Sequence, residues 1–411
     1  MHDIGKKLSI FDFIFCLFNQ IGYLCIVKRI SKSTFAMKKH TPSLLLLALI
    51  GLTFALNSCT KPVPEDTAYI FTSFREPSTR GLQYLYSLDG LHWDTLPGVW
   101  LAPMVGNDTT YIDAWTGQEQ APKYYPDERV MRDPSIVRGP DGTFHLVWTT
   151  QWMGSRGFGY ASSRDLIHWS EQRVIDVMAD IPTNNVWAPE LFYDEELRQY
   201  LIIWSSQIDP LTYTAADTLG TNSCHRLWYT TTRDFLTFTP AQRYYDPGFN
   251  SIDGYLLQRG PKDYVLVVKD NRKPGFSNLF CVFGDSPYGP FHPSNLSLPS
   301  DATNESNPSN SSNPSNPSNP SNSSNPSNLP PSPTFGRTYS EGPCAIWLGD
   351  EWIIYFDQYH PQEYGAVATR DFLTFTPIPE RISVPADHKH GTIVEVSRKQ
   401  LDALIKYANE H

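Results

Sequence analysis

The sequence predicts an all-β protein folded as a five-bladed β-propeller, on three observations. One short pattern recurs, in which an apolar run, a small or hydroxyl residue and an Asp-based turn precede an aromatic residue. The intervening segments are short, rich in β-branched and aromatic residues, and bounded by turn formers, as strands are. Helical periodicity is nearly absent. Such repetition is typical of stacked supersecondary units. Four copies and a looser fifth occupy residues 86–93, 161–169, 230–238, 367–375 and 284–291.

Each repeat is interpreted as three or four antiparallel strands, which suits a propeller blade. Four repeats are complete and span residues 133–176, 187–240, 253–291 and 341–376. The copy at 68–100 lacks an inner strand, and a spare strand lies at 390–396. Pairing these segments would close the fifth blade with strands from both chain ends and leave no open sheet edge. Ser397 and Gln400 have the spacing of a capping box and predict a short C-terminal helix.

The N-terminal segment is expected to direct export from a bacterium. A basic start, an apolar core and a small-residue cleavage site predict a signal peptide over 37–58. Because Cys59 follows in a lipobox-like sequence, we expect a lipoprotein acylated there, on the periplasmic or cell-surface side of the outer membrane. The alternative is an unmodified Cys59 after an ordinary signal peptide. Residues 1–36 are interpreted as a mis-called extension, and residues 59–67 as a tether.

Charge and composition exclude some classes of function. The net charge is −10, and removing residues 1–58 deletes seven basic and two acidic residues, which takes it to −15. An acidic exported protein has no electrostatic reason to bind nucleic acid. The remaining cysteines, Cys224, Cys281 and Cys344, are too few and too scattered for a disulfide framework or a zinc site, and are expected to be buried.

Residues 68–411 are expected to form one propeller domain, and the chain to be a monomer. Residues 303–333 are dominated by Asn-Pro-Ser, a composition that cannot form a packed core, and are interpreted as a disordered insertion.

Three acidic residues stand at the start of the inner strand in three different repeats: Asp133, Asp253 and Glu341. Each alone, before Pro or Gly, would be interpreted as a turn residue. In a propeller, however, the inner strands surround one axis, so the three side chains would face a common funnel. This convergence predicts acid–base chemistry.

Aromatic residues fall into two groups under the same repeat. Those that recur at one repeat position are expected to belong to the core, namely Trp93, Trp169, Phe238 and Phe375. Those outside that position are candidates for stacking against a sugar ring, namely Trp115, Trp152, Trp187 and Tyr359.

Five short motifs, in this order, resemble glycoside hydrolase family 43. They are Arg132-Asp-Pro-Ser-Ile, Trp187-Ala-Pro-Glu, Ile252-Asp-Gly, Ser340-Glu-Gly-Pro and His390-Gly-Thr. The resemblance covers about residues 68 to 397 and implies a five-bladed propeller that hydrolyses arabinose- or xylose-containing plant polysaccharides with inversion. It implies Asp133 as the general base, Glu341 as the general acid and Asp253 as the group that orients the acid and raises its pKa.

The resemblance also implies a set of substrate-binding residues: Arg132, Trp152, Trp187, Glu190, Tyr359 and His390. Glu190 departs from the pattern, since Asp is common there, and Gly254 replaces a Pro or Ala. His390 resembles an axial histidine that holds a metal or water in some members, so a structural Ca²⁺ near it is one option, although no metal or other cofactor is expected to be required.

Inverting hydrolysis needs one carboxylate to activate water and one protonated carboxyl for the leaving oxygen, with the pair roughly 6.5–9.5 Å apart. A neighbouring acid can keep the second carboxyl protonated. We therefore expect release of α-L-arabinofuranosyl or β-D-xylosyl residues from oligosaccharides or polysaccharides. One alternative is a surface lipoprotein that binds glycans without cleaving them. Another is a retaining, fructan-cleaving propeller, for which the chain lacks an early Asn-Asp-Pro-Asn motif.

Overall fold

The computed structural model describes residues 66–106, 110–121, 128–219, 223–272, 278–293, 333–358 and 362–411. Several sequence-based predictions lie outside these ranges. They are the extension 1–36, the signal peptide 37–58, acylated Cys59, all but two residues of the tether 59–67, all but the last residue of the insertion 303–333, and Tyr359. Within the described ranges, no helix has the length and apolar character needed to cross a membrane.

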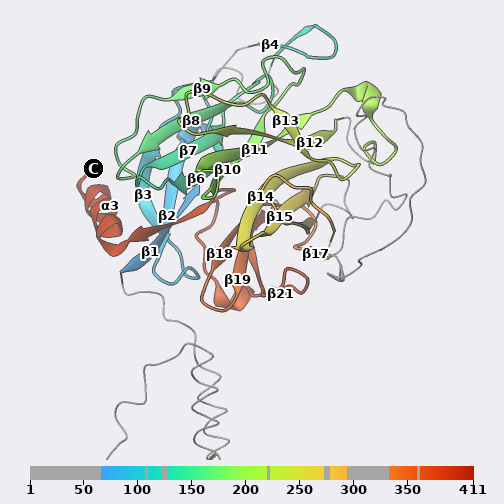
Figure 1. The fold of residues 1–411 in the computed structure, drawn as a ribbon. Helices are drawn as coiled ribbons and strands as arrows, with labels where there is room; N and C mark the ends of the chain where they lie inside the picture. Colours follow the sequence, from blue (N-terminus) through green and yellow to red (C-terminus); the bar gives the residue numbers. More distant parts are fainter. Residues whose placement is uncertain are drawn as a thin grey trace, which may run out of the picture. The chain divides into compact units, whose positions relative to one another are not determined.

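Five four-stranded antiparallel sheets form the described part of the chain, as the five-bladed propeller predicted (Figure 1). From the inner strand outward, four blades follow the sequence. The first of these has β6 (Arg132–Arg138), β7 (Phe144–Thr149), β8 (Phe158–Ser163) and β9 (Arg173–Ile175). The second has β10 (Trp187–Asp194), β11 (Gln199–Gln207), β12 (His225–Thr232) and β13 (Gln242–Tyr245). The third has β14 (Ser251–Gly260), β15 (Asp263–Asp270), β16 (Leu279–Gly284) and β17 (Thr334–Phe335). The fourth has β18 (Ser340–Trp347), β19 (Trp352–Gln358), β20 (Glu363–Thr369) and β21 (Thr376–Pro377).

The remaining blade is built from both ends of the domain, which confirms the predicted closure. Its order is β22 (Ile393–Ser397), β1 (Thr67–Ser73), β2 (Leu82–Ser87) and β3 (Asp94–Leu101). Ile70 pairs with Val394 on one side and with Tyr86 on the other. A hairpin of β4 (Tyr111–Ile112) and β5 (Glu119–Gln120) lies outside the blades, and 3₁₀ turns occupy Ser78–Arg80, Pro210–Thr212 and Pro379–Arg381.

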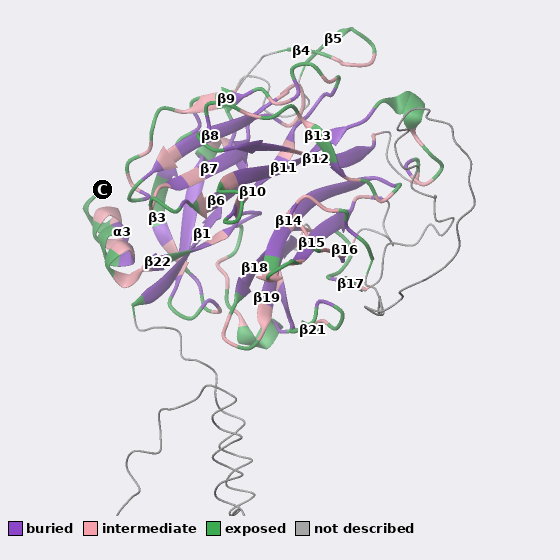
Figure 2. Ribbon diagram, in the orientation of Figure 1, coloured by how far each residue is buried: buried purple, intermediate pink, exposed green. Residues whose placement is uncertain are grey.

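The hydrophobic core is divided into five clusters, and each lies between two neighbouring blades. Trp148 belongs to the cluster between the β22–β3 and β6–β9 blades, and Trp204 to the next one. Tyr355 packs in the cluster that joins the last sheet back to the first. Since both faces of every blade are covered, the second and third strands of each blade are buried along most of their length, whereas outer strands such as β3 are largely exposed (Figure 2). The predicted burial of Cys224, Cys281 and Cys344 is also confirmed.

The recurring sequence pattern is a recurring turn. In the copy at Asp165, Oδ1 accepts hydrogen bonds from the backbone N–H groups of Ile167 (2.9 Å) and His168 (2.8 Å). The residue after the Asp is left-handed, with φ of 67° at Leu166, and its side chain is fully buried. Asp89, Asp234 and Asp371 repeat these bonds. In three of these copies the turn thus anchors one apolar side chain in the core (Leu166, Phe235 and Phe372), whereas Gly90 follows Asp89 in the fourth.

The in-phase aromatic residues pack against the core as expected. Trp93 is buried, whereas Trp169, Phe238 and Phe375 are partly buried at the edges of three clusters.

The C-terminal helix α3 (Arg398–Glu410) begins with the predicted capping box. The backbone N–H of Gln400 donates to Ser397 Oγ (3.2 Å), and the backbone N–H of Ser397 donates to Gln400 Oε1 (3.1 Å). Leu401 and Leu404 bury the apolar face of the helix against the blade that closes the ring, which ties the end of the chain to β1.

Candidate active site

A β-bulge recurs at one place in the inner strands of four blades. In each, the ladder to the second strand slips by one residue, for example between Arg132 and Ser135 and between Ile252 and Tyr255. The same slip occurs in β10 and β18. The first bulged residue is left-handed in all four: Asp133 (φ 51°), Ala188 (φ 48°), Asp253 (φ 53°) and Gly342 (φ 57°). Bulges redirect a side chain and are common beside active sites.

The bulge corrects one expectation about the three acids. Asp133 and Asp253 both occupy the left-handed position, as predicted, but Glu341 stands one residue earlier and pairs with Asp357. Its counterparts in two other blades are Arg132 and Ile252. Alignment of Pro343 with Pro134 shows the offset, because it places Gly342 rather than Glu341 at the position of Asp133.

Asp133 is held ionised by its neighbours. His390 Nδ1 lies 3.3 Å from Asp133 Oδ1, and Thr149 Oγ1 donates to Asp133 Oδ2 (2.8 Å). Burial would raise the pKa of Asp133, but His390, Arg132 and Thr149 outweigh it and lower that pKa. Burial likewise would lower the pKa of His390, yet the hydrogen bond and charge of Asp133 raise it to about 10. The pair is therefore carboxylate and imidazolium, and Asp133 can accept a proton.

Glu341 lies beside a lysine that the sequence did not reveal. Lys269 Nζ donates to Glu341 Oε2 at 2.6 Å, and the lysine is almost fully buried. Burial would raise the pKa of Glu341, but the charge and hydrogen bond of Lys269, followed by the charges of Lys389 and His390, lower it. In the free protein the pKa of Glu341 is thus lowered, because the nearby cation outweighs the nearby acid. The role of Asp253 in raising the pKa of Glu341 stays a prediction.

Protons are instead favoured on two other carboxyls of the same group. Burial and the charge of Glu341 raise the pKa of Asp253 to about 6 and that of Asp357 to about 7. Asp253 Oδ2 accepts a hydrogen bond from Gly342 N–H (3.0 Å), and Asp357 Oδ2 accepts one from His390 N–H (3.0 Å). Glu341, Asp253 and Asp357, called the acid set below, therefore titrate together rather than singly.

These backbone bonds also join successive blades. Ala188 N–H donates to Thr149 Oγ1 (2.8 Å), and Asp253 N–H donates to Ser205 Oγ (3.2 Å), each across a blade boundary. A Cβ on Gly342 would lie 2.5 Å from His390 Cγ. The bulges thus pack against one another around the centre of the ring, which brings Asp133, Asp253, Glu341 and His390 together.

Aromatic residues and an arginine lie beside the acids. Arg132 Nη1 contacts Glu76 Oε1 (2.5 Å), and its guanidinium lies 5.0 Å from the ring centroid of Trp152. Trp187 donates from Nε1 to the Trp152 carbonyl (2.5 Å) and stacks on His225 at 4.6 Å. Both tryptophans are partly exposed. Arg132, Trp152 and Trp187 therefore form a wall with partly exposed ring surface, as expected of a sugar site.

Trp115 lies further out, in the β4–β5 hairpin. Its backbone N–H donates to Asp113 Oδ1 (3.1 Å), and Asp113 in turn accepts from Asn184 Nδ2 (2.6 Å). The hairpin is thus tied to the segment that leads into Trp187.

Glu190 is a buried carboxyl, with about the same small exposed fraction as Arg132 and Asp253. It stands two residues beyond the left-handed Ala188 in β10 and is 6% exposed. Burial raises the pKa of Glu190 to about 8, and the charge of His390 and the Ser135 hydroxyl offset only part of this effect. The carboxyl is therefore protonated at neutral pH, and its role as a substrate-binding residue stays a prediction.

Replacing Glu190 by Gln is expected to stabilise the protein at alkaline pH. The folded-state pKa is raised, so stability is lost as pH rises from about 4 toward 8, and the amide removes this loss. We expect a melting temperature unchanged at pH 5 and raised by about 5 °C at pH 9. Glu195→Gln, an exposed acid in the next turn, is the control. Equal changes at both pH values would contradict the burial argument.

The residues around His390 do not suit a metal ion. No group of three His, Cys, Asp or Glu side chains within the described ranges is arranged to hold one. The negative charge of Asp133 keeps His390 protonated, and Lys269 is ion-paired with Glu341 close by. An imidazolium cannot ligate a cation, and a buried ammonium repels one. We therefore assign no Ca²⁺ to this site.

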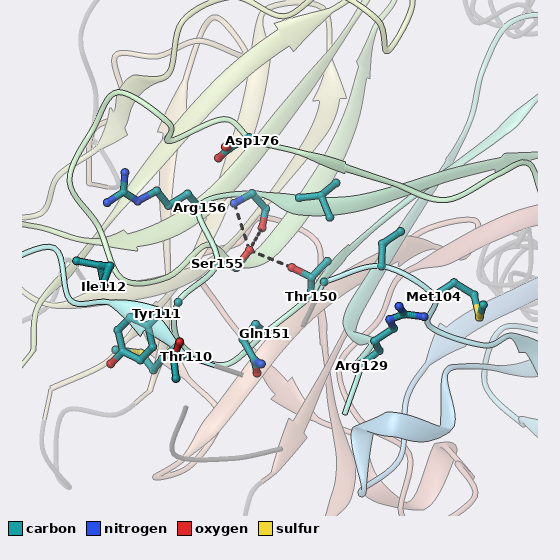
Figure 3. A pocket seen from close by; sticks show the side chains of 16 residues that line it. Met104, Thr110, Tyr111, Ile112, Arg129, Thr150, Gln151, Ser155, Arg156 and Asp176 are labelled. Atoms are coloured by element: carbon teal, nitrogen blue, oxygen red, sulfur yellow. Dashed lines mark hydrogen bonds between the residues drawn. The ribbon is translucent and has the colours of Figure 1, made fainter. Parts of the chain in front are cut away.

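A cavity of about 820 Å³ opens beside Gln151, one residue beyond Thr150 in the segment after β7 (Figure 3). Met104, Tyr111, Arg129 and Arg156 contribute to its lining. Ser155 Oγ lies 3.0 Å from Thr150 Oγ1 on its wall. None of the acid set lines it, and neither does Asp133, so we give it no part in the reaction.

The fold and the acids indicate a glycoside hydrolase, and comparison with known proteins gives the family. A model described as a probable glycosyl hydrolase domain, related to family 43, matches residues 65–402. The chain therefore belongs to this family, and the resemblance seen in the five motifs is confirmed.

An α-L-arabinofuranosidase of Bifidobacterium longum subsp. longum is 24% identical over an aligned length of 245 residues. The match covers 54% of this chain and 21% of that protein. The chain thus matches about a fifth of the length of this curated relative. Among solved structures, a thermostable family-43 glycoside hydrolase has a TM-score of 0.40 at 13% identity, covering 60% of this chain and 71% of its own. An exo-β-1,3-galactanase of Phanerochaete chrysosporium has a TM-score of 0.41 at 13% identity, covering 66% and 53%.

Proposed function

We propose that the protein is an inverting glycosidase in which Asp133 is the general base and Glu341 the general acid. The observation that carries this proposal is the division of one site into two electrostatic halves. Asp133 is ionised beside imidazolium His390, whereas the acid set of Glu341, Asp253 and Asp357 retains protons through burial and mutual repulsion. Inverting hydrolysis needs one carboxylate and one carboxylic acid in the same site.

In the proposed reaction, Asp133 takes a proton from water as the water oxygen forms a bond to the anomeric carbon. The glycosidic C–O bond breaks on the opposite face, and Glu341 gives its proton to the leaving oxygen. Arg132, Trp152 and Trp187 would position the sugar. Two carboxyls and one water balance the reaction, so no cofactor is required.

Glu341 has to gain its proton from the rest of the acid set. In the free protein Lys269 favours ionised Glu341, while the raised pKa values of Asp253 and Asp357, about 6 and 7, leave Asp357 partly and Asp253 slightly protonated near neutral pH. Because the carboxyls titrate together, a bound sugar that weakens the Lys269 contact would transfer a proton to Glu341. After each turnover Asp133 carries the proton taken from water and the acid set lacks the proton given to the leaving oxygen, so one proton must pass back from Asp133 to the acid set through solvent while Glu341 returns to its ion pair with Lys269.

For the substrate, we propose terminal α-L-arabinofuranosyl residues first and β-D-xylosyl residues second. The relative from Bifidobacterium longum, an α-L-arabinofuranosidase, supports the first choice. We further propose, from the sequence alone, a monomer exported and anchored to the outer membrane through Cys59.

The proposal is tested by following hydrolysis of nitrophenyl α-L-arabinofuranoside and β-D-xyloside by proton NMR. The first product formed should carry the inverted anomeric configuration. Retention of configuration would contradict the base assignment of Asp133. Binding of arabinan or xylan fragments without turnover of any glycoside would favour a glycan-binding protein instead.

The pH dependence of kcat/KM should follow the titration of the acid set. Since the acid form is required, kcat/KM should fall as pH rises through the raised pKa values, by about tenfold per unit above pH 7. Asp133, whose pKa is lowered, should limit activity only in strongly acidic solution. In Asp357→Asn the alkaline fall should begin nearer pH 6, the value for Asp253, and Asp402→Asn on α3 should leave it unchanged. An alkaline limb that does not move in Asp357→Asn would exclude proton sharing.

A further inference from the structure

A second hollow lies at the opposite ends of the strands that carry the acids. Its volume is about 510 Å³, and Gln258, Arg259, Asp263, Trp347, Trp352 and Arg370 line it. Trp347 ends β18, six residues after Glu341, and Gln258, near the end of β14, stands five residues after Asp253. At about 3.3 Å per strand residue, Trp347 lies roughly 20 Å from the acid along the strand. The hollow is thus distinct from the catalytic funnel.

Two tryptophans form one wall of this hollow. The ring centroids of Trp347 and Trp352 are 5.4 Å apart, with 56° between the ring planes. Trp352 packs inward on Phe372, at 5.9 Å, and is fixed by that contact. Trp347 packs on Trp352 but is 48% exposed. The exposed face of Trp347 is therefore held rigidly in solvent. A ligand that binds to this face would cost the protein little further side-chain entropy.

The tryptophan pair differs from its counterparts in the repeat by its exposure. At the same place in their strands, six residues after the start of the bulge, the other three bulged blades carry Arg138, Tyr193 and Gln258. Tyr193 packs on its cross-strand partner Tyr200 (4.9 Å), as Trp347 packs on Trp352, but Tyr193 is partly buried whereas Trp347 is 48% exposed. The exposed face of Trp347 is therefore more than the cross-strand pairing requires, which favours binding.

The polar groups beside the tryptophans are also held in place. Arg259 donates to Asp263 Oδ1 through Nε (3.1 Å) and Nη2 (2.6 Å), and to the Asp371 carbonyl through Nη1 (3.0 Å). Arg370 donates from Nη2 to Asp350 Oδ2 (2.6 Å). A guanidinium has five N–H donors and a carboxylate several lone pairs, so these groups can bond sugar hydroxyls while keeping their partners.

We propose that this hollow binds a polysaccharide chain outside the catalytic funnel. The C–H face of one sugar would pack on Trp347, and its hydroxyls would bond Arg259, Asp263 and Gln258. A rigid aromatic face with a few fixed polar groups at its edge suits a neutral, hydroxyl-rich ligand. The ion pairs cancel most of the local charge, which disfavours a strongly charged partner. This site deepens the proposed glycosidase function by holding the polymer whose terminal residues are cleaved.

The test compares wild type and Trp347→Ala in native gels containing arabinan, arabinoxylan or arabinogalactan, with dextran as the reference. We expect the variant to bind the retarding polysaccharide about tenfold more weakly, and Trp347→Phe to keep most of the affinity. Hydrolysis of a nitrophenyl glycoside, which is too small to reach both sites, should be unchanged. Leu236→Ala, which removes another exposed apolar side chain (71% exposed), is the control for surface effects.

Equal retardation of wild type and Trp347→Ala in every gel would overturn the second site, whether or not the protein hydrolyses the small glycoside. Loss of retardation in Trp347→Ala would support the site even if no glycoside were cleaved, so the two proposals fail separately. A change in sedimentation of Trp347→Ala, with no change in retardation, would assign the surface to a second copy of the chain and overturn the proposal.

Discussion

Asp133→Asn is expected to abolish hydrolysis of activated and unactivated glycosides alike. The amide cannot accept the proton of the attacking water, and it also removes the charge that keeps His390 protonated. A loss of about 10²–10⁴-fold in kcat is expected for removal of a positioned base. Because water attack is needed for every leaving group, the loss should be similar for nitrophenyl glycosides and for oligosaccharides. Initial rates on both substrates provide the measurement.

Asp141→Asn is the matched control for this variant. Asp141 follows the same strand, β6, at its other end, where its carboxylate accepts from Thr143 and Arg164 on the surface. It should keep wild-type rates. Asp133→Asn activity within a few-fold of wild type on either substrate, in protein with an unchanged melting temperature, would remove Asp133 from the role of base.

Glu341→Gln is expected to lose activity in proportion to the basicity of the leaving group. Oligosaccharides and alkyl glycosides, whose leaving oxygens need a proton, should be hydrolysed about 10²–10⁴-fold more slowly. Dinitrophenyl glycosides, whose leaving groups depart as anions, should lose far less. The amide has no proton to give to the leaving oxygen, so the alkaline fall in activity should disappear from the remaining rate. The substitution also breaks the ion pair with Lys269. Rates across a series of aryl glycosides measure this dependence.

Two comparisons keep this prediction specific. Glu351→Gln, at the start of β19 in the same blade and ion-paired to Arg381, should show no leaving-group dependence. A Glu341→Gln protein that slows all substrates equally would indicate a general disturbance of the site, and the role of acid would then pass to Asp253 or Asp357.

The fold was predictable because the repeat recurs in the sequence itself. The Asp turns, the five blades and the closure by residues 390–396 depend on local patterns, and all three are present. The same patterns located Asp133 and Asp253, since both occupy the bulge before Pro or Gly. Family membership followed from short motifs near those bulges.

Lys269 and Asp357 could not be found in this way. Both lie in second strands and pair with the residue just before the left-handed one. Thr149 and Ser205 occupy the same place in two other blades. Inside an apolar strand each looks like an isolated polar residue. Their importance depends on the distance to Glu341 and on burial, which only packing determines. The lowered pKa of Glu341 beside Lys269 could not be predicted for the same reason.

The closure of the ring also sets an order of events during synthesis. Ile70 pairs with Val394, more than three hundred residues later, so the first blade waits for the last strand to leave the ribosome. That late segment also brings His390, whose imidazolium holds Asp133. Earlier blades can form as they emerge, but the ion pair between His390 and Asp133 cannot form until the C-terminal segment arrives. Under the mechanism proposed above, activity and closure of the ring would therefore be acquired together.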